Sequence, residues 1–202
     1  MPRVSEEHLE SRRQQILEAA RRCFVRNGFH ETSMHDVFAE SQLSAGAVYR
    51  YFSSKDELIT AIASTGVSQL ELAFETVLAD DDPPPLDRVL ELLLEQVRRL
   101  EAERQLCALA VQIWAEAGRN PTMRAWFDGT MARVRGWFAR LIEIYQQRGL
   151  VESGHRPQDA ALVLGTLLPG ILVQVALLGD IDPQAFANGV RLLGIPAGPL
   201  IS

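Results

Sequence analysis

The sequence predicts an all-α protein with a small three-helix head at its N-terminus, which contains a helix-turn-helix, and a larger helical body behind it. Apolar residues recur at spacings of three and four through most of the 202-residue chain, as they do on one face of a helix. Several breaks between these segments hold glycine or proline, which end helices. No segment alternates polar and apolar residues as a half-buried strand does.

The first two helices are indicated by their ends. The first is expected over 8–27, where the apolar stripe ends at Gly28, because glycine accepts the left-handed conformation that closes a helix. A short second helix begins near Ser33 and runs to about Ser41. Ser33 and Asp36 have the spacing of a capping box, in which each satisfies a backbone amide at the start of the helix.

The next two helices are separated from the second by a turn at 42–44. Ser44 is expected to cap a third helix that continues through Phe52. Ser54 is expected to cap a fourth that runs to Leu78. These four segments have the order of a helix-turn-helix followed by a longer helix.

The body begins after an acidic, proline-rich run at 80–85, which is expected to be a loop because consecutive prolines cannot continue a helix. Further helical patterns follow at 86–103, 105–117, 122–148, 157–179 and 183–193.

Within the segment 157–179, residues 160–179 are long enough and apolar enough to suggest a membrane span. Its flanks, Asp159 and Asp180, are acidic, and it lacks the interfacial aromatic residues and positive charges of such spans. A helix that is apolar all round can also be buried inside a protein or at a subunit interface. We expect the buried helix, and no membrane partner.

Composition further narrows the class of protein and the kinds of site it can hold. The chain is 47% hydrophobic and 23% charged, as soluble globular proteins are. Its two cysteines, Cys23 and Cys107, lie in apolar helical patterns and are expected to be buried, reduced thiols. Two cysteines and four scattered histidines are too few for a disulfide framework or a zinc site. The N-terminus lacks the apolar core of a signal peptide, so a cytoplasmic protein is expected.

The net charge of −6 weighs against a nucleic-acid partner until it is divided by region. Residues 1–55 carry eight basic and seven acidic groups, so the excess of acids belongs to 56–202. The head is therefore free to approach phosphate groups.

The third helix has the residues that a recognition helix needs. Its start, Ser44-Ala45-Gly46, is small, so the backbone can approach a groove closely. Val48 and Phe52 are four apart and are expected to anchor it to the core. Tyr49 and Arg50 then fall beside Gly46 on the outward side, where such helices meet DNA bases.

Lys55 is the one lysine in the chain and lies in the first turn of the fourth helix, where the helix dipole disfavours a cation. It can join the exposed amides there in holding a DNA phosphate. The alternative is a solvated lysine whose neighbours Asp56 and Glu57 offset the dipole. Next to the expected recognition helix, we favour the phosphate contact.

A series of head residues agrees in order and spacing with one known pattern: Ile16, Leu17, Ala19, Ala20, Phe24, Gly28, Phe29, Thr32, Ser33, Val37, Leu43, Ser44, Tyr49, Arg50, Tyr51, Phe52, Lys55 and Leu58. The pattern resembles the DNA-binding head of the TetR/AcrR family of regulators over about residues 12–60. The break at 116–121 also resembles a common junction of that family.

This resemblance implies a homodimer whose two heads read a palindromic DNA operator. It also implies a helical body that binds a small-molecule effector and pairs through its last two helices, 157–179 and 183–193. The expected domains are a helix-turn-helix head at 1–54 and an effector-binding and dimerisation body at 55–202. The expected function is a repressor that an apolar small molecule releases from DNA; a transcriptional activator of the same fold is the alternative. No cofactor is expected.

By position, the resemblance assigns base reading to Gly46 and Tyr49. Phosphate contacts fall to Ser44, Arg50, Tyr51 and Lys55, with help from Ser33 or His35, and Ala45 completes the expected DNA surface. The chain departs from the family at Phe38, where a small residue is usual, and at Gln42, where glycine is common. Phe38 is expected to alter the packing angle of the helices, and Gln42 to adopt an unfavourable dihedral angle.

The effector site is less defined. The body is rich in aromatic and thioether side chains, as apolar ligand sites are, although most such residues form core. From this set we expect the cavity to be lined by Trp114, Met123, Phe127 and Met131. The stripes hold no basic cluster, which favours a neutral or cationic ligand over an anionic one.

An enzyme is the main rival class, and a membrane-associated adaptor using 160–179 is a third possibility. The sequence holds no phosphate-binding glycine loop, GxSxG elbow or HExxH helix. The four histidines are His8, His30, His35 and His155. None of them has a cysteine or a carboxylate nearby at the spacing of metal ligands. We therefore expect no catalytic residues and no metal ligands.

Overall fold

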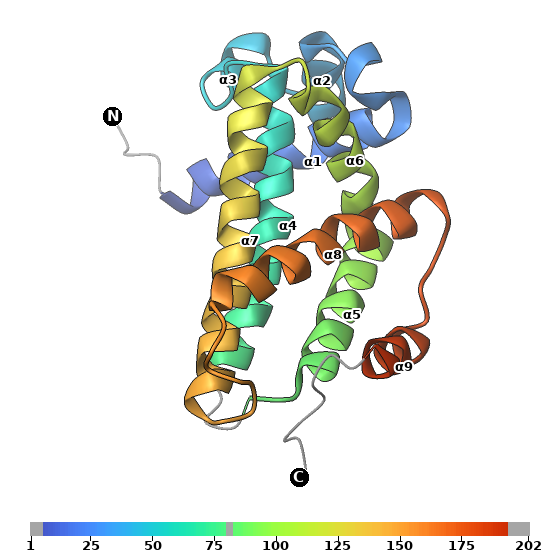
Figure 1. Ribbon diagram of the computed structural model, residues 1–202. Coiled ribbons are helices and arrows are strands. Elements are labelled where there is room, and N and C mark those ends of the chain that lie inside the picture. Colours follow the sequence, from blue (N-terminus) through green and yellow to red (C-terminus); the bar gives the residue numbers. More distant parts are fainter. Residues whose placement is uncertain (1–5, 80–82, 194–202) are drawn as a thin grey trace.

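The computed structural model describes residues 6–79 and 83–193. Within these ranges the chain forms nine α-helices and no strand, so the predicted all-α class is confirmed. They are α1 (Glu6–Glu31), α2 (Met34–Ser41), α3 (Ala45–Tyr49), α4 (Lys55–Leu78), α5 (Leu86–Arg104), α6 (Leu106–Ala117), α7 (Pro121–Gln147), α8 (Pro157–Leu177) and α9 (Pro183–Leu192) (Figure 1).

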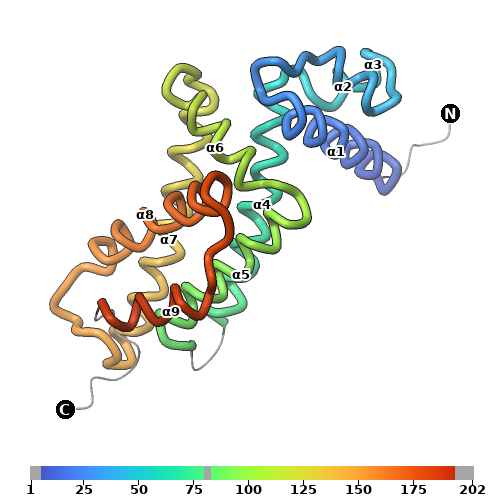
Figure 2. Tube along the Cα trace, turned by 90° about the vertical axis from the view of Figure 1, so that its right-hand side faces the viewer, coloured from blue at the N-terminus to red at the C-terminus, as the bar shows by residue number. Residues whose placement is uncertain are grey.

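The head consists of α1, α2, α3 and the first turns of α4, which lie together at one end of the molecule (Figures 1 and 2). Its core contains Phe24 of α1 and Val37 of α2, both fully buried. Val48 and Phe52 are also buried, which confirms that they anchor the third helix. At Gly28, with φ 81°, the first helix kinks before it continues to Glu31.

Serine side chains begin three of the head helices, as their spacing predicts. The Ser33 hydroxyl accepts from the Asp36 amide, and the Asp36 side chain accepts from the Ser33 amide, which completes the capping box. Ser44 caps α3 and Ser54 caps α4 in the same position. Gln42 has φ 58°, the left-handed conformation expected where the family usually has glycine.

The third helix is shorter than predicted. Its regular part ends at Tyr49, not at Phe52. The amides of Tyr51 and Phe52 both donate to the Val48 carbonyl, which tightens the chain into a turn before α4.

The body is built around α4, which extends out of the head, and the long helix α7 beside it (Figure 1). Helix α8 crosses α7, and α9 packs on α5. The Arg191 guanidinium donates to the buried Asp87 carboxylate at 2.6 Å and so ties α9 to the start of α5. Aromatic packing is concentrated at Phe74, which lies against Trp137 and Phe138.

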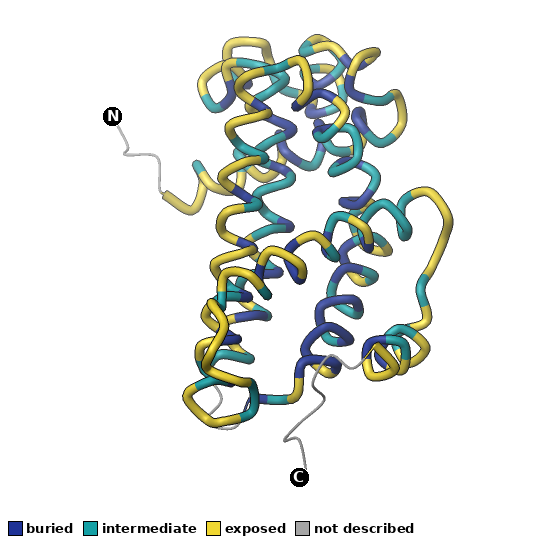
Figure 3. The backbone as a smooth tube through the Cα atoms, in the orientation of Figure 1, coloured by how far each residue is buried: buried dark blue, intermediate teal, exposed yellow. Residues whose placement is uncertain are grey.

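Helix α8 is buried on one face only. Along α8, buried and exposed positions are mixed (Figure 3). Leu164 and Leu168 lie in the core, whereas Leu162 and Val163 are exposed. Among the described residues, α8 is the one helix long and apolar enough to cross a membrane. Only 28% of its most apolar stretch is buried within this chain, so the burial expected for this helix, inside the protein or at a subunit interface, is not completed by a single copy.

Candidate nucleic-acid interface and effector cavity

The helix-turn-helix presents most of the predicted DNA-binding residues to solvent. Seven of them are exposed on α2, on α3 or at the residues that cap these helices: Ser33, His35, Ser44, Ala45, Gly46, Tyr49 and Arg50. Tyr51 and Lys55 are half-buried. Helices α2 and α3 contact one another at the far end of the head (Figure 2), so this face is free of the body.

Tyr49 is held in place by Phe38, the bulky side chain at a position where the family usually has a small residue. Its ring meets Phe38 of α2 edge to face, with centroids 5.3 Å apart. Half of the Tyr49 surface remains exposed, at 50%. The bulky side chain at position 38 therefore supports the residue expected to read bases.

Arg50 differs from other arginines of the head. Arg22 and Arg26 both contact Glu40, and these two hydrogen bonds lower the pKa of the Glu40 carboxyl group. Arg50 has no acidic partner within the described part of the chain and is exposed. Its guanidinium is therefore available to a phosphate without first breaking an ion pair.

The two capping serines differ in what they can still donate. The Ser33 hydroxyl donates to Asp36 at 2.7 Å, so its proton is already used. The same bonds lower the pKa of Asp36. The Ser44 hydroxyl accepts from the Ala47 amide at 3.3 Å and keeps its own proton for another acceptor. Ser44 is therefore better suited than Ser33 to hold a phosphate.

Lys55 has partners that sequence reasoning missed. Its Nζ donates to the Phe29 carbonyl at 2.6 Å and to the His30 carbonyl at 3.3 Å. It also lies 4.4 Å from the centroid of the Phe29 ring. A cation is stabilised at the carbonyl end of a helix, here the end of α1. The structure thus corrects the reason for a lysine at this place: it joins α4 to α1. Its phosphate contact stays a prediction.

Helix α6 links the head to the body. Gln112 Nε2 donates to the Phe24 carbonyl of α1 at 3.4 Å. Glu116 lies 2.8 Å from His30 Nε2, and its pKa is lowered mainly by Arg119 and further by His30. A second link joins the starts of α4 and α7, where Asn120 donates to Asp56 at 2.5 Å.

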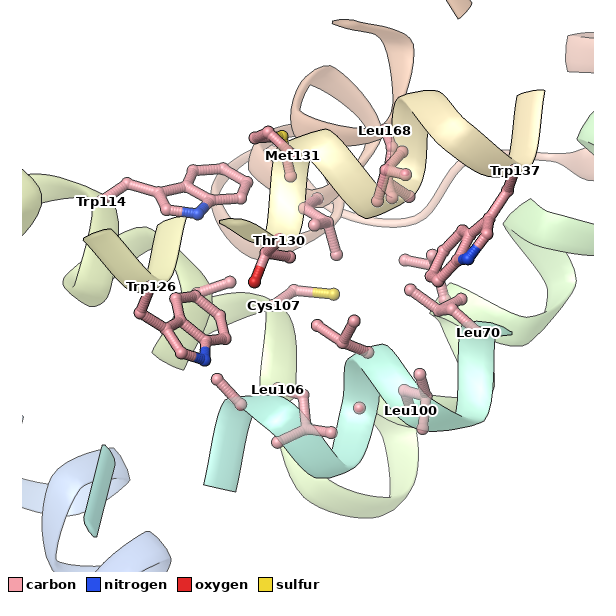
Figure 4. A pocket seen from close by; sticks show the side chains of 17 residues that line it. Leu70, Leu100, Leu106, Cys107, Trp114, Trp126, Thr130, Met131, Trp137 and Leu168 are labelled. Atoms are coloured by element: carbon pink, nitrogen blue, oxygen red, sulfur yellow. The ribbon is translucent and has the colours of Figure 1, made fainter. Parts of the chain in front are cut away.

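A cavity of about 60 Å³ lies between the other side of α6 and helices α4, α5, α7 and α8 (Figure 4). Its walls are almost entirely apolar and are formed by Ala63, Gly66, Val67, Leu70, Val97, Leu100, Leu106, Cys107, Ala110, Trp114, Trp126, Thr130, Met131, Val134, Trp137, Leu168 and Leu172.

Two of the four residues expected at the effector site, Trp114 and Met131, line this cavity. The other two do not, and the reason is the rotation of α7. Met123 is fully buried near its start, and Phe127 packs edge-on against the Trp114 ring at 6.0 Å. The face of α7 that meets the cavity instead carries Trp126, Thr130, Val134 and Trp137, at helical spacings of three and four.

The indole nitrogens of two cavity tryptophans are already paired. Trp126 Nε1 donates to the Ser64 hydroxyl at 2.9 Å, and Trp137 Nε1 donates to Glu71 at 3.2 Å. These rings therefore contribute carbon surface to the wall. Burial, and then the Glu101 carboxylate, raise the pKa of the Cys107 thiol, which keeps it neutral. Over the described ranges, no group of three or more histidine, cysteine, aspartate or glutamate side chains could hold a metal ion.

Comparison with known proteins covers both parts of the chain. Residues 16–62 match the family described as bacterial regulatory proteins, tetR family. Residues 85–191 match the family described as BetI-type transcriptional repressor, C-terminal.

Individual relatives match along almost their whole length. The HTH-type transcriptional regulator YfiR of Bacillus subtilis is 47% identical, over 94% of this chain and 91% of its own. The HTH-type transcriptional regulator UidR of Escherichia coli K12 is 27% identical, over 90% of each chain. The solved structure of Salmonella enterica GusR is similar with a TM-score of 0.76 and 26% identity, over 96% of this chain and 99% of its own.

Proposed function

The chain belongs to the TetR family of bacterial regulatory proteins, and on this premise we propose that it is a cytoplasmic, homodimeric repressor without enzymatic activity. It binds a palindromic operator and leaves it when a small apolar molecule enters the cavity of the body. The observation that carries the proposal is the position of α6, which has the tryptophan-lined cavity on one side and α1 of the head on the other.

In this proposal, the head at 1–54 contacts DNA and the body at 55–202 senses the effector. Gly46 and Tyr49 read bases, while Ser44 and Arg50 hold phosphates. Their exposure, the free proton of Ser44 and the absence of an acidic partner for Arg50 among the described residues support these roles. Base contacts supply sequence preference, and phosphate contacts supply register and most of the affinity.

The homodimer pairs through α8 and α9, which lie on one side of the body (Figure 2). Large apolar side chains are exposed along this side at Leu162, Val163, Leu177, Leu178, Leu192 and Leu193. Large apolar side chains exposed together on one side of a soluble protein are typical of an interaction site. A two-fold dimer covers both copies of the same surface at once, so α8 is assigned to a subunit interface and not to a membrane.

Release from DNA follows from the cavity's position. A molecule that widens the cavity moves α6 relative to α4 and α7, and α6 contacts α1 through Gln112 and Glu116. The two recognition helices of a dimer bind DNA productively only about 34–36 Å apart, or a multiple of that. A ligand that prefers the mis-spaced dimer therefore weakens operator binding by population shift.

The test is a gel-shift titration of the full chain with the DNA upstream of its own gene and of the neighbouring genes. The proposal predicts a shift at one palindromic segment, its reversal by a small apolar compound, and a dimer by light scattering. Failure to shift any of these duplexes, or a monomer at micromolar concentration, would contradict it.

A further inference from the structure

One hydroxyl in the cavity wall has no hydrogen-bond partner among the described residues. Thr130 is only 7% exposed, and its hydroxyl points into the cavity beside Trp126 and Cys107 (Figure 4). This hydroxyl makes no hydrogen bond to any described residue. A hydroxyl that faces a cavity without a protein partner is expected to pair with a polar atom of whatever fills that space.

Other hydroxyls in the helices of the body show that this state is unusual. Thr60, Ser64 and Thr65 of α4 each donate to the carbonyl four residues earlier, at 2.8, 2.7 and 3.3 Å. Such a bond satisfies a threonine or serine inside its own helix. Thr130 has a helical backbone too, yet its hydroxyl is turned to the cavity instead.

The rest of the wall offers no charge to a ligand. None of the lining residues is charged. The nearest carboxylates are engaged, because Glu71 pairs with Arg133 and Trp137, and Glu101 accepts from the Cys107 amide at 2.7 Å. A charged group placed in such a site loses its hydration without gaining a partner.

We propose that the effector is a small uncharged molecule, mostly ring or hydrocarbon, with a single hydroxyl or similar hydrogen-bonding group that pairs with Thr130 Oγ1. The aromatic rings and Met131 take the apolar part, and Thr130 fixes its orientation. This inference rests on the proposed function, which makes the cavity the effector site.

The size of the cavity adds a condition. At about 60 Å³ it is much smaller than an engineered cavity of about 150 Å³ that holds benzene. A ring-containing ligand therefore needs the walls to move apart. Helices α4 and α6 lie close together at this wall, where a Cβ at Gly66 would lie 2.9 Å from Leu106 Cδ1. In this proposal the wall opens there, and α6, the helix that contacts the head, moves.

The chain carries its own reporter, because all three of its tryptophans line the cavity. Tryptophan fluorescence is titrated with p-cresol, toluene and p-toluate, which share a ring and a methyl group and differ in a hydroxyl, a hydrogen and a carboxylate. We expect p-cresol to bind more tightly than toluene, and p-toluate not to bind. The hydroxyl difference corresponds to about three- to tenfold in affinity.

Thr130→Val keeps the side-chain shape and removes the hydroxyl. It is expected to lower the affinity for p-cresol by about three- to tenfold and to leave toluene unchanged, while Thr130→Ser restores the preference. Trp114→Phe is the matched control. The Trp114 side chain is half-buried in the same wall, and its N–H is a second donor without a partner among the described residues. The control removes this donor and keeps the Thr130 hydroxyl.

The outcomes separate this inference from the proposed function. Three results would overturn the role of Thr130 and leave the effector cavity in place. They are an equal fall in affinity for p-cresol and toluene in Thr130→Val, a loss of the preference for p-cresol in Trp114→Phe and not in Thr130→Val, and tight binding of p-toluate. No response to p-cresol or toluene, even in a Met131→Ala variant with a larger cavity, would overturn the effector site itself. The gel shift without any ligand tests the DNA-binding head independently.

Discussion

Phe38 of α2 and Tyr49 of α3 meet edge to face, with their ring planes 69° apart and their centroids 5.3 Å apart. The contact joins the two helices of the helix-turn-helix at the residue assigned to base reading. A side chain that departs from the family pattern therefore has a structural purpose in this chain.

Phe38→Ala removes this support without removing any predicted DNA contact. An aromatic pair of this geometry contributes about 0.5–1.5 kcal/mol. We expect operator affinity to fall by about three- to tenfold, because Tyr49 must then be ordered on binding. Fluorescence anisotropy with labelled operator measures this, and Phe38→Tyr, which keeps the ring contact, is the control. Unchanged affinity in Phe38→Ala would contradict the supporting role.

Lys55→Met tests whether this lysine stabilises the fold. The substitution keeps the apolar stem but leaves the carbonyls of Phe29 and His30 without their charged donor. Urea unfolding without DNA is expected to show a loss of about 1–2 kcal/mol. If stability were unchanged while operator affinity fell, Lys55 would act on phosphate alone.

Gly66→Ala tests the contact between α4 and α6. The added methyl would lie 2.9 Å from Leu106 Cδ1, so Leu106 must shift beside the cavity. Alanine also gains about 1 kcal/mol of helix propensity over glycine, which offsets the strain. We expect stability within about 1 kcal/mol of the parent and clearly weaker binding of p-cresol.

Gly165→Ala on α8 is the matched control for that change. Its Cβ would meet the Arg135 side chain at the same 2.9 Å, but neither residue lines the cavity. Equal weakening of p-cresol binding in both variants would show that the effect does not arise at the cavity wall.

Gln112→Met tests the route from α6 to the head. It removes the bond to the Phe24 carbonyl and a buried amide oxygen that has no partner, while keeping the side-chain volume. We expect ligand binding to persist, and the ligand-induced loss of operator affinity to shrink by up to about fivefold. Gln146→Met, at the far end of α7, should leave that coupling as in the parent. An unchanged coupling in Gln112→Met would rule out this route.

The fold could be predicted largely because its boundaries depend on local chemistry. The caps at Ser33, Ser44 and Ser54 act within three residues of themselves, so their spacing is visible in the sequence. The end of α3 was missed because the Val48 carbonyl accepts from two amides in a turn that no residue type marks.

The candidate sites were predicted less completely because they depend on packing between distant segments. The carbonyl partners of Lys55 lie 25 and 26 residues earlier in the chain, and no local pattern announces them. Likewise, the apolar residues of α7 occupy more than one face, and only the rotation of that helix against α4 and α6 decides that Thr130 faces the cavity and Phe127 does not.

The central claim is that the outward face of α3 binds duplex DNA, and the most direct test is operator affinity measured across salt concentrations. Arg50→Ala should weaken binding to every duplex and make the slope of log affinity against log salt shallower by about 0.9 for each subunit. Tyr49→Ala should instead reduce the preference for operator over a duplex changed at the contacted bases. Arg140→Ala, which removes an exposed arginine of the body, should match the parent. If Arg50→Ala and Tyr49→Ala bound the operator as the parent does, with the same slope and the same preference, this surface would not be the DNA-binding face.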